Sequence, residues 1–134
     1  MVTFLWRTEG SPEPLHSENP FSDVNPGAWY YKAVLWAVQN GITNGTGKTT
    51  FSPNAVVTRG QAVTFLWRVR DMPQAAASHP FVDLVPGQYY CDAVQWAAEK
   101  QITVGMDASH FFPSHLCTRA QIVTFLYRTY YDRR

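Results

Sequence analysis

The chain has 134 residues, a formal net charge of +1 and 16% charged residues, fewer than the roughly 25% of an average soluble protein. The near-neutral charge argues against binding to nucleic acid or to an anionic membrane surface. No apolar run approaches the roughly 20 residues of a membrane-spanning helix. Met1 leads directly into a helical pattern, without a basic start or a cleavage site, so we expect no signal peptide in this sequence.

Two long segments of the chain repeat one another at an offset of 60 residues. Phe21–Arg68 and Phe81–Arg128 align without a gap, and 22 of 48 positions are identical. Met1–Arg7 matches the last seven residues of both. One repeat is a supersecondary unit that usually cannot bury its apolar face alone. We therefore divide the chain into a truncated repeat with its linker (1–20), a full repeat with its linker (21–80) and a second full repeat (81–134).

Each full repeat opens with F-x-D-x-x-P-G, a turn that leads into a predicted helix at about residues 28–40 and 88–100. Gly41 suits the left-handed cap at the end of the first of these helices, and Gln101 suits the same place in the second less well. Trp29 and Tyr89 open the two helices. Trp6, Trp67 and Tyr127 lie near the ends of the second helices. We expect most of these five rings in the core, with some lining a groove, since aromatic faces suit sugar rings.

A loop of about 15 residues follows each predicted helix, and both copies keep a glycine, a phenylalanine and a proline there: Gly45 and Gly105, Phe51 and Phe111, Pro53 and Pro113. The phenylalanine is expected to fill the core, and the proline prevents a continuing helix. Loops of this length without structure of their own are often functional.

Each of the two loops contains one apparent motif that does not fit the site it suggests. The segment Asn44–Thr50 is similar to a phosphate-binding loop, but the spacing of its glycines is wrong and no helix follows. Asp107, His110 and His115 could suggest a metal site, but the other repeat has no counterparts and the spacing fits no zinc motif. We expect solvated loop residues, no metal and no cofactor.

The second helix of each repeat has a clear start. Thr58 with Gln61, and Thr118 with Gln121, fit a helix-capping box. An arginine follows each threonine, Arg59 in one repeat and Arg119 in the other, although the partial positive charge of a helix N-terminus disfavours a cation there. A guanidinium at a helix N-terminus can bind an anionic group such as a carboxylate. The alternatives are an internal ion pair with Asp23 or Asp83, or a solvated side chain.

No set of residues typical of nucleophilic or acid–base catalysis recurs between the repeats, so we expect no enzyme activity. Cys91 and Cys117 both lie in the second full repeat, where the first has Tyr31 and Val57. They are either two buried thiols or a disulfide, which the sequence alone does not decide.

Taken together, the F-x-D turn, the helix ending in G-I-T, the G…F-x-P loop and the T-R-x-Q-x-V-T-F-L-x-R helix resemble the S-layer homology domain of bacterial cell-surface proteins. The resemblance covers both full repeats, with Met1–Arg7 as the tail of a preceding copy. It implies an all-α fold in which helix–loop–helix repeats form a partial pseudo-threefold bundle. It also implies an extracellular location in the cell wall or S-layer.

The family's ligand, by this resemblance, is a secondary cell wall polysaccharide, often carrying pyruvate ketals, that binds in grooves between repeats. The ligand-binding positions that it implies are an arginine, an aspartate, an aromatic residue and a glycine in each repeat: Arg59, Asp23, Trp29 and Gly45, and Arg119, Asp83, Tyr89 and Gly105. A ketal carboxylate would bind the arginine.

The chain departs from the family pattern in three places. Gln61 and Gln121 replace a glutamate, which preserves capping but removes a negative charge. The loops Gly45–Thr50 and Gly105–His110 differ from each other, so the two sites are not equivalent. The first repeat lacks its first half, which a partner chain could complete by domain swapping or oligomerisation. We therefore expect a non-catalytic wall-anchoring module, and the alternative is a protein–protein or self-assembly module that has lost glycan binding.

Overall fold

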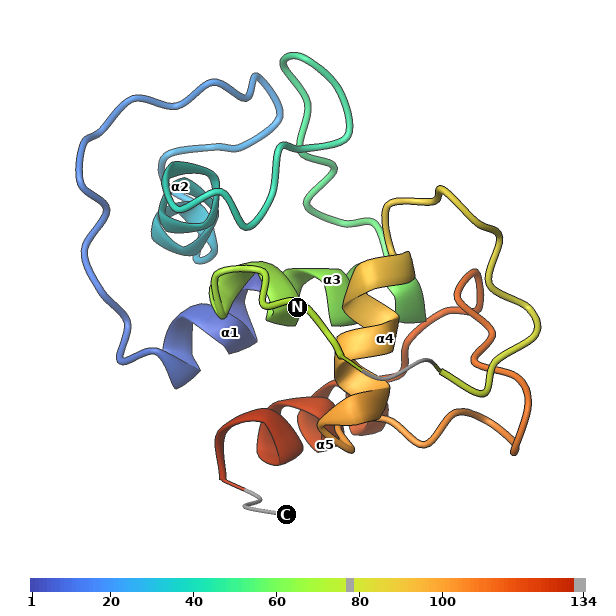
Figure 1. Cartoon of the computed structure of the whole chain (residues 1–134). Coiled ribbons are helices and arrows are strands. Elements are labelled where there is room, and N and C mark those ends of the chain that lie inside the picture. Colours follow the sequence, from blue (N-terminus) through green and yellow to red (C-terminus); the bar gives the residue numbers. More distant parts are fainter. Residues whose placement is uncertain (77–78, 132–134) are drawn as a thin grey trace. The chain divides into compact units, whose positions relative to one another are not determined.

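The computed structural model describes residues 1–76 and 79–131, and over those residues it is helical, which confirms the predicted all-α class (Figure 1). The helices are α1 (Val2–Thr8), α2 (Tyr31–Gln39), α3 (Arg59–Val69), α4 (Cys91–Glu99) and α5 (Arg119–Tyr130). None of the helices in this described part is long and apolar enough to cross a membrane. The chain divides into two compact units, Met1–Ala55 and Val56–Arg134. The pseudo-threefold arrangement of the repeats stays a prediction.

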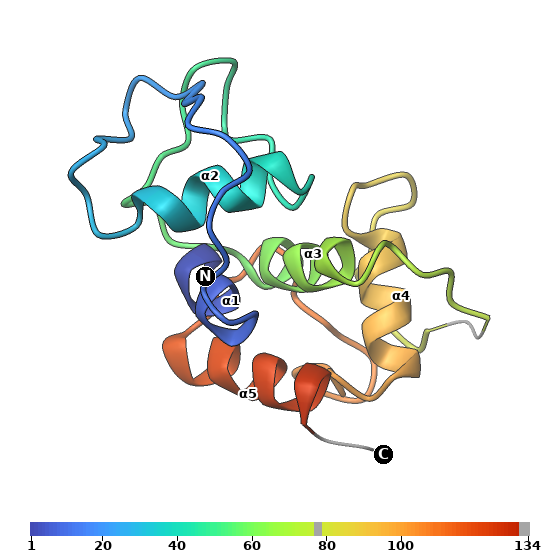
Figure 2. The same ribbon diagram turned by 90° about the vertical axis from the view of Figure 1, so that its left-hand side faces the viewer.

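In the first unit, α1 packs against α2, and both views show the two helices as neighbours (Figures 1 and 2). Leu5 of α1 and Ala33 of α2 are fully buried. A second cluster forms where the opening turn meets the helix, with Phe21, Val24 and Val34 at its centre. Burial of these side chains is what fixes the short helices, because isolated helices of this length are marginal in water.

In the second unit, α3 packs against α4 and also contacts α5. Figures 1 and 2 both show α4 lying across one end of α3. Val63 and Leu66 of α3, Val94 of α4 and Phe111 of the following loop are fully or almost fully buried. The helix–helix contacts therefore join the second helix of one repeat to the first helix of the next.

The first helix of each repeat begins three residues later than the sequence predicts, at Tyr31 and at Cys91. The preceding residues form turns, closed in the first repeat by a bond from the Tyr31 N–H to the Ala28 carbonyl oxygen at 3.1 Å. As a result Trp29 and Tyr89 stand outside the core, 72% and 51% exposed. Tyr127 is 57% exposed as well, so three of the five rings lie outside the core, and the expectation that most of them are buried was wrong.

The second helices begin where the capping motifs place them. In α3 the Gln61 N–H donates to Thr58 Oγ1 at 3.1 Å, and the Thr58 N–H donates to Gln61 Oε1 at 2.9 Å. In α5 the reciprocal bonds between Thr118 and Gln121 measure 3.1 and 3.0 Å. Each box satisfies two backbone N–H groups that a helix start would otherwise leave without a partner.

Candidate ligand-binding site

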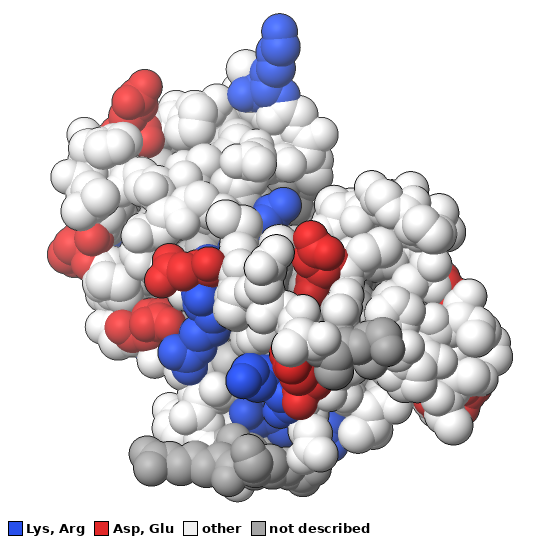
Figure 3. All heavy atoms as spheres, viewed as in Figure 1, with Lys and Arg blue, Asp and Glu red and all other residues white. Residues whose placement is uncertain are grey.

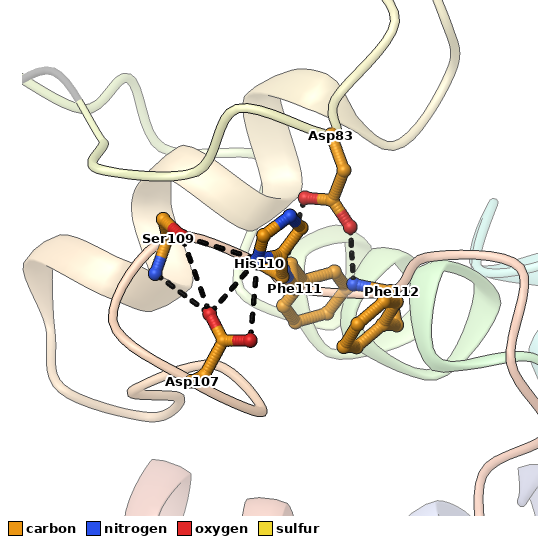
Figure 4. Close-up of polar contacts among 6 residues, drawn as sticks. All are labelled: Asp83, Asp107, Ser109, His110, Phe111 and Phe112. Carbon is orange, nitrogen blue, oxygen red and sulfur yellow. Dashed lines mark hydrogen bonds and ion pairs between the residues drawn. The ribbon is translucent and has the colours of Figure 1, made fainter.

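The aspartates of the two F-x-D turns hold the long loops in place. The carboxylate of Asp83 accepts hydrogen bonds from the N–H groups of Phe111 and Phe112, at 3.0 and 2.7 Å (Figure 4). Asp23 binds the N–H groups of Phe51 and Ser52 in the same way, both at 2.8 Å. These bonds lower the pKa of Asp23. For Asp83, partial burial acts to raise the pKa, but the bonds from Phe111 and Phe112 outweigh it and the pKa is lowered.

A glycine is required at the start of each loop. Gly45 and Gly105 have φ angles of +83° and +85°, which side chains rarely adopt. A Cβ on Gly105 would lie 2.5 Å from Cε1 of Phe81 and 2.8 Å from the carbonyl oxygen of His110. The loop therefore turns tightly around the phenylalanine of the opening turn, and this turn is what carries the backbone toward α5.

Arg59 is buried, with only 3% of its surface exposed. Its guanidinium lies over the rings of Phe111 and Phe125, with its central carbon 4.6 and 5.4 Å from the ring centres. Its Nε donates to the Phe111 carbonyl oxygen at 2.9 Å. Burial lowers the pKa of Arg59, and the nearby Asp83 acts in the opposite direction, but arginine remains charged in proteins. Asp83 and Arg59 do not form an ion pair among the described residues, so this one of the internal pairs considered from the sequence is absent.

The start of α3 is held by the loop of the second full repeat. The Arg59 N–H donates to the His115 carbonyl oxygen at 2.8 Å, and the Gly60 N–H to the Pro113 carbonyl oxygen at 2.9 Å. The Cys117 N–H donates to the Val57 carbonyl oxygen at 2.8 Å. These bonds join the two full repeats and place the Arg59 side chain among residues of the second.

Arg59 lines an open pocket with a volume of about 270 Å³. The pocket is built from the start of α3, the loop after α4 and one side of α5. Its lining residues are Arg59, Thr103, Val104, Gly105, Met106, Ala120, Gln121, Thr124, Phe125 and Arg128. Among these described residues two are cationic and none is acidic. The arrangement can therefore hold a small anionic group against a partly apolar wall.

The structure brings together only some of the residues singled out from the sequence. Arg59, Gly105 and Gln121 share the pocket. Tyr89 and Asp83 do not line the pocket. Asp83 holds the loop after α4, part of which forms the pocket wall. Arg119 is exposed at the start of α5 and is not part of the pocket wall.

The counterparts in the first full repeat, Asp23, Trp29 and Gly45, belong to the other compact unit. The sequence reasoning missed Thr103, Thr124 and Arg128. The recurring I-T and T-F-L-x-R segments contain all three.

The loop of the second full repeat carries a local polar network. Asp107 accepts from the Ser109 N–H at 2.9 Å and lies 3.0 Å from Nδ1 of His110 (Figure 4). The bond from Ser109 and the contact with His110 lower the pKa of Asp107. The rings of Phe112 and His115 stack with their centres 4.5 Å apart. Among the described residues no group of three potential ligands could hold a metal ion.

Both cysteines are free thiols in the structure. The Cys91 thiol donates to the Val85 carbonyl oxygen at 3.0 Å. Cys117 is 8% exposed, and this burial raises the pKa of its thiol. Of the two alternatives left open by the sequence, the structure has the separate thiols.

Comparison with known families matches the S-layer homology domain at residues 20–63 and 80–123, which covers more than half of the chain. The chain belongs to the S-layer homology domain family. The two matched segments agree with the two full repeats. S-layer homology domains act as cell-surface anchoring modules in S-layer proteins and in surface enzymes.

Individual relatives agree with this assignment. An endoglucanase of Bacillus sp. (strain KSM-635) is 32% identical over 111 residues, which are 83% of this chain and 12% of that enzyme. A cell surface protein of Thermoanaerobacter kivui is 30% identical over 114 residues, 81% of this chain and 15% of that protein. The surface-layer 125 kDa protein of Lysinibacillus sphaericus is 46% identical over 46 residues, 34% of this chain and 4% of that protein.

The chain thus spans less than a sixth of the length of these relatives. The part it shares with the endoglucanase is a small fraction of that protein, and the matched family segments are S-layer homology repeats. The family and its S-layer relatives place the chain at the cell surface or in the S-layer, which confirms the predicted location.

Proposed function

We propose that this chain anchors a bacterial surface protein by binding an anionic secondary cell wall polysaccharide in the pocket beside Arg59. One observation carries the proposal: the pocket holds a buried guanidinium, and no acidic residue lines it among those described. A buried charge is normally paired or bound to a ligand. A pocket of about 270 Å³ matches one charged sugar residue better than a long chain segment.

The orientation of Arg59 supports an external partner. Its Nε donates a hydrogen bond to the Phe111 carbonyl oxygen, and its two Nη groups make no hydrogen bond within the described part of the chain. Among the described residues, every fully buried side-chain nitrogen or oxygen has a hydrogen-bond partner. Because the Nη groups have none, they are not fully buried and retain contact with solvent. They are the donors that a carboxylate would accept from in bidentate geometry.

The remaining positions have supporting roles in this proposal. Asp83 shapes the loop, Gly105 allows the backbone to reach the pocket, and Val104 and Met106 form an apolar rim for a sugar face. The face drawn in Figure 3 carries charged side chains of both signs, with no broad patch of one sign. Recognition is local to the pocket.

The test is co-sedimentation of the purified chain with Gram-positive cell-wall sacculi, before and after acid extraction of the secondary polymer. Pelleting that disappears on extraction is expected. Arg59→Gln should lose binding, while its amide can still donate to Phe111; circular dichroism verifies the fold. Absence of pelleting with unextracted sacculi would overturn the proposal.

A self-assembly module is the second candidate, and the surface of α5 favours it. Val123 and Tyr127 of α5 are each 57% exposed. The corresponding Val63 of α3 is fully buried. A second copy of the chain could cover this face of α5. Association through it would resist salt, because apolar contact is not screened, whereas glycan binding through Arg59 should weaken with salt. Sedimentation equilibrium at low and high salt distinguishes the two.

A further inference from the structure

Arg128 lies near the end of α5 in the second full repeat. It lines the same pocket as Arg59, which begins α3 in the first full repeat. Its Nη1 donates to the carbonyl oxygen of Ile102 at 3.2 Å, directly before the loop that forms the pocket wall. The other donors of this guanidinium have no hydrogen-bond partner among the described residues. A single bond to a carbonyl oxygen fixes the direction of the side chain and leaves most of its donors available.

Two like charges lining a pocket of about 270 Å³ repel each other. Buried charges are usually paired with an opposite charge, but no aspartate or glutamate is among the described lining residues. The ion pairs of Lys32 with Glu13 and of His110 with Asp107 do not involve these arginines. An anion bound between the two guanidinium groups would reduce this repulsion.

We infer that Arg128 is a second ligand-binding cation of this pocket and that it contacts the same anionic group as Arg59. This inference rests on the function proposed above and names a further residue of the same site. The fork of each guanidinium matches the two oxygens of a carboxylate. Two arginines from different elements would fix the orientation of the carboxylate, which one arginine alone leaves free to rotate about a single axis.

A structural role for Arg128 is the alternative that the experiment must exclude. A cation in the last turn of a helix interacts favourably with the helix dipole, and the bond to Ile102 could serve only to tie α5 to the loop. Such a role changes stability but makes no contribution to the salt dependence of binding. The repeat supplies a matched control in Arg68, which holds the same position in α3 and does not line the pocket.

The experiment measures the affinity of the intact chain for sacculi that carry the secondary polymer, at salt concentrations from about 50 to 300 mM, where screening changes strongly. The variants are Arg128→Gln, Arg128→Lys and Arg68→Gln, each with its midpoint of urea unfolding. Removing a charge-assisted contact should lower affinity about tenfold to a hundredfold in Arg128→Gln. It should also reduce the slope of log affinity against log salt.

Arg128→Lys keeps the charge and should recover part of the affinity and the original slope, and Arg68→Gln should bind like the unmodified chain. Equal affinities for Arg128→Gln and Arg68→Gln would overturn the inference while leaving the anchoring function intact. A loss in Arg128→Gln with an unchanged salt slope would also overturn it, because the side chain would then act only through the fold. If the unmodified chain does not bind sacculi, the proposed function itself fails, and the inference fails with it.

Discussion

Arg59 and Phe111, which are 52 residues apart in the sequence, are joined by a hydrogen bond of 2.9 Å from Nε to the carbonyl oxygen, and the guanidinium lies over the phenylalanine ring. The contact links the start of α3 in one repeat to the loop of the next. Arg59 thus has two places in the structure: its Nε joins the two repeats, and its side chain also lines the pocket.

The structural role of Arg59 predicts a clear difference between the two Thr-Arg motifs. Arg59→Ala leaves the Phe111 carbonyl without its partner and opens a space between two rings, so it should lower the free energy of unfolding by about 2–4 kcal/mol. Arg119→Ala, at an exposed position, should lower it by less than about 1 kcal/mol. Urea unfolding of both variants measures the difference. Similar values for the two would contradict the assignment of Arg59 to the core.

These two arginines also show what could be predicted from the sequence and what could not. The local signals were strong: the capping boxes at Thr58 and Thr118 predict where α3 and α5 begin, and the repeats predict the family and the all-helical class. Both motifs have the same Thr-Arg pattern, yet Arg59 is buried and Arg119 exposed. Burial depends on which distant loop covers a helix start, and local sequence does not contain that information.

The start of the first helix in each repeat is a second feature that could not be predicted from the sequence. Trp29 and Tyr89 fit the apolar spacing of a helix, and the spacing predicted burial. In the structure they lie in the preceding turns and are exposed. Their neighbours Tyr30 and Tyr90 pack inward instead, with the ring pairs in edge contact at 5.3 and 5.4 Å. A shift of one residue at a helix start exchanges which ring is buried, and periodicity alone cannot fix it.

The tight turn at Gly105 predicts a large effect of added bulk. Gly105→Ala places a methyl group against Phe81 and a backbone oxygen in addition to the strain of its positive φ, and it should destabilise the chain by about 2–4 kcal/mol. Gly87→Ala is the matched control, because Gly87 has a φ of +86° but nothing within 4 Å of the added Cβ. It should cost about 1 kcal/mol. Thermal unfolding of both variants separates steric overlap from backbone strain, and equal shifts would show that overlap at Gly105 is unimportant.

A glycine at the left-handed position after α4 should increase the stability of the chain. Gln101 has a φ of 58°, and its counterpart Gly41 after α2 has a φ of 70°. The Ile102 N–H donates to the Ala97 carbonyl oxygen at 2.8 Å, as Ile42 does to Ala37 at 2.9 Å, so both helices end in the same left-handed geometry. Gln101→Gly relieves the strain of a side chain in this conformation and should stabilise the chain by about 0.5–1 kcal/mol. A lower unfolding midpoint for Gln101→Gly would contradict this reading of the cap.

The cysteines should differ in reactivity. Cys117 is buried and the pKa of its thiol is raised, so little thiolate is available for attack on a disulfide reagent. Cys91 is only partly buried. Under native conditions a thiol-reactive reagent should modify Cys91 first and Cys117 slowly, and in denaturant it should modify both. The variant Cys91→Ser isolates the slow reaction. Detection of no free thiol in denaturant, without added reductant, would indicate a disulfide and contradict the structure.

The two aspartate clamps predict loss of stability in acid. The pKa of Asp83 is lowered from its ordinary value of 3.8 because the folded carboxylate accepts from Phe111 and Phe112, bonds that outweigh the opposing effect of burial. The folded state therefore binds fewer protons than the unfolded state. The stabilisation is fully present above the unfolded pKa near 3.8 and is lost as the pH falls through the lower folded pKa. The same sign applies to Asp23.

Asp83→Asn tests this directly. An amide can accept from one of the two N–H groups but presents its NH₂ group to the other, so the variant should be less stable than the unmodified chain at neutral pH. Because it has no carboxylate to protonate, its stability should fall less steeply below about pH 4. Urea unfolding between about pH 7 and pH 2 gives both curves, and Asp92→Asn, at an exposed position of α4, controls for the change in net charge. Parallel curves for Asp83→Asn and the unmodified chain would show that protonation of Asp83 does not open the loop, and the acid sensitivity would then have to come from Asp23 or another group.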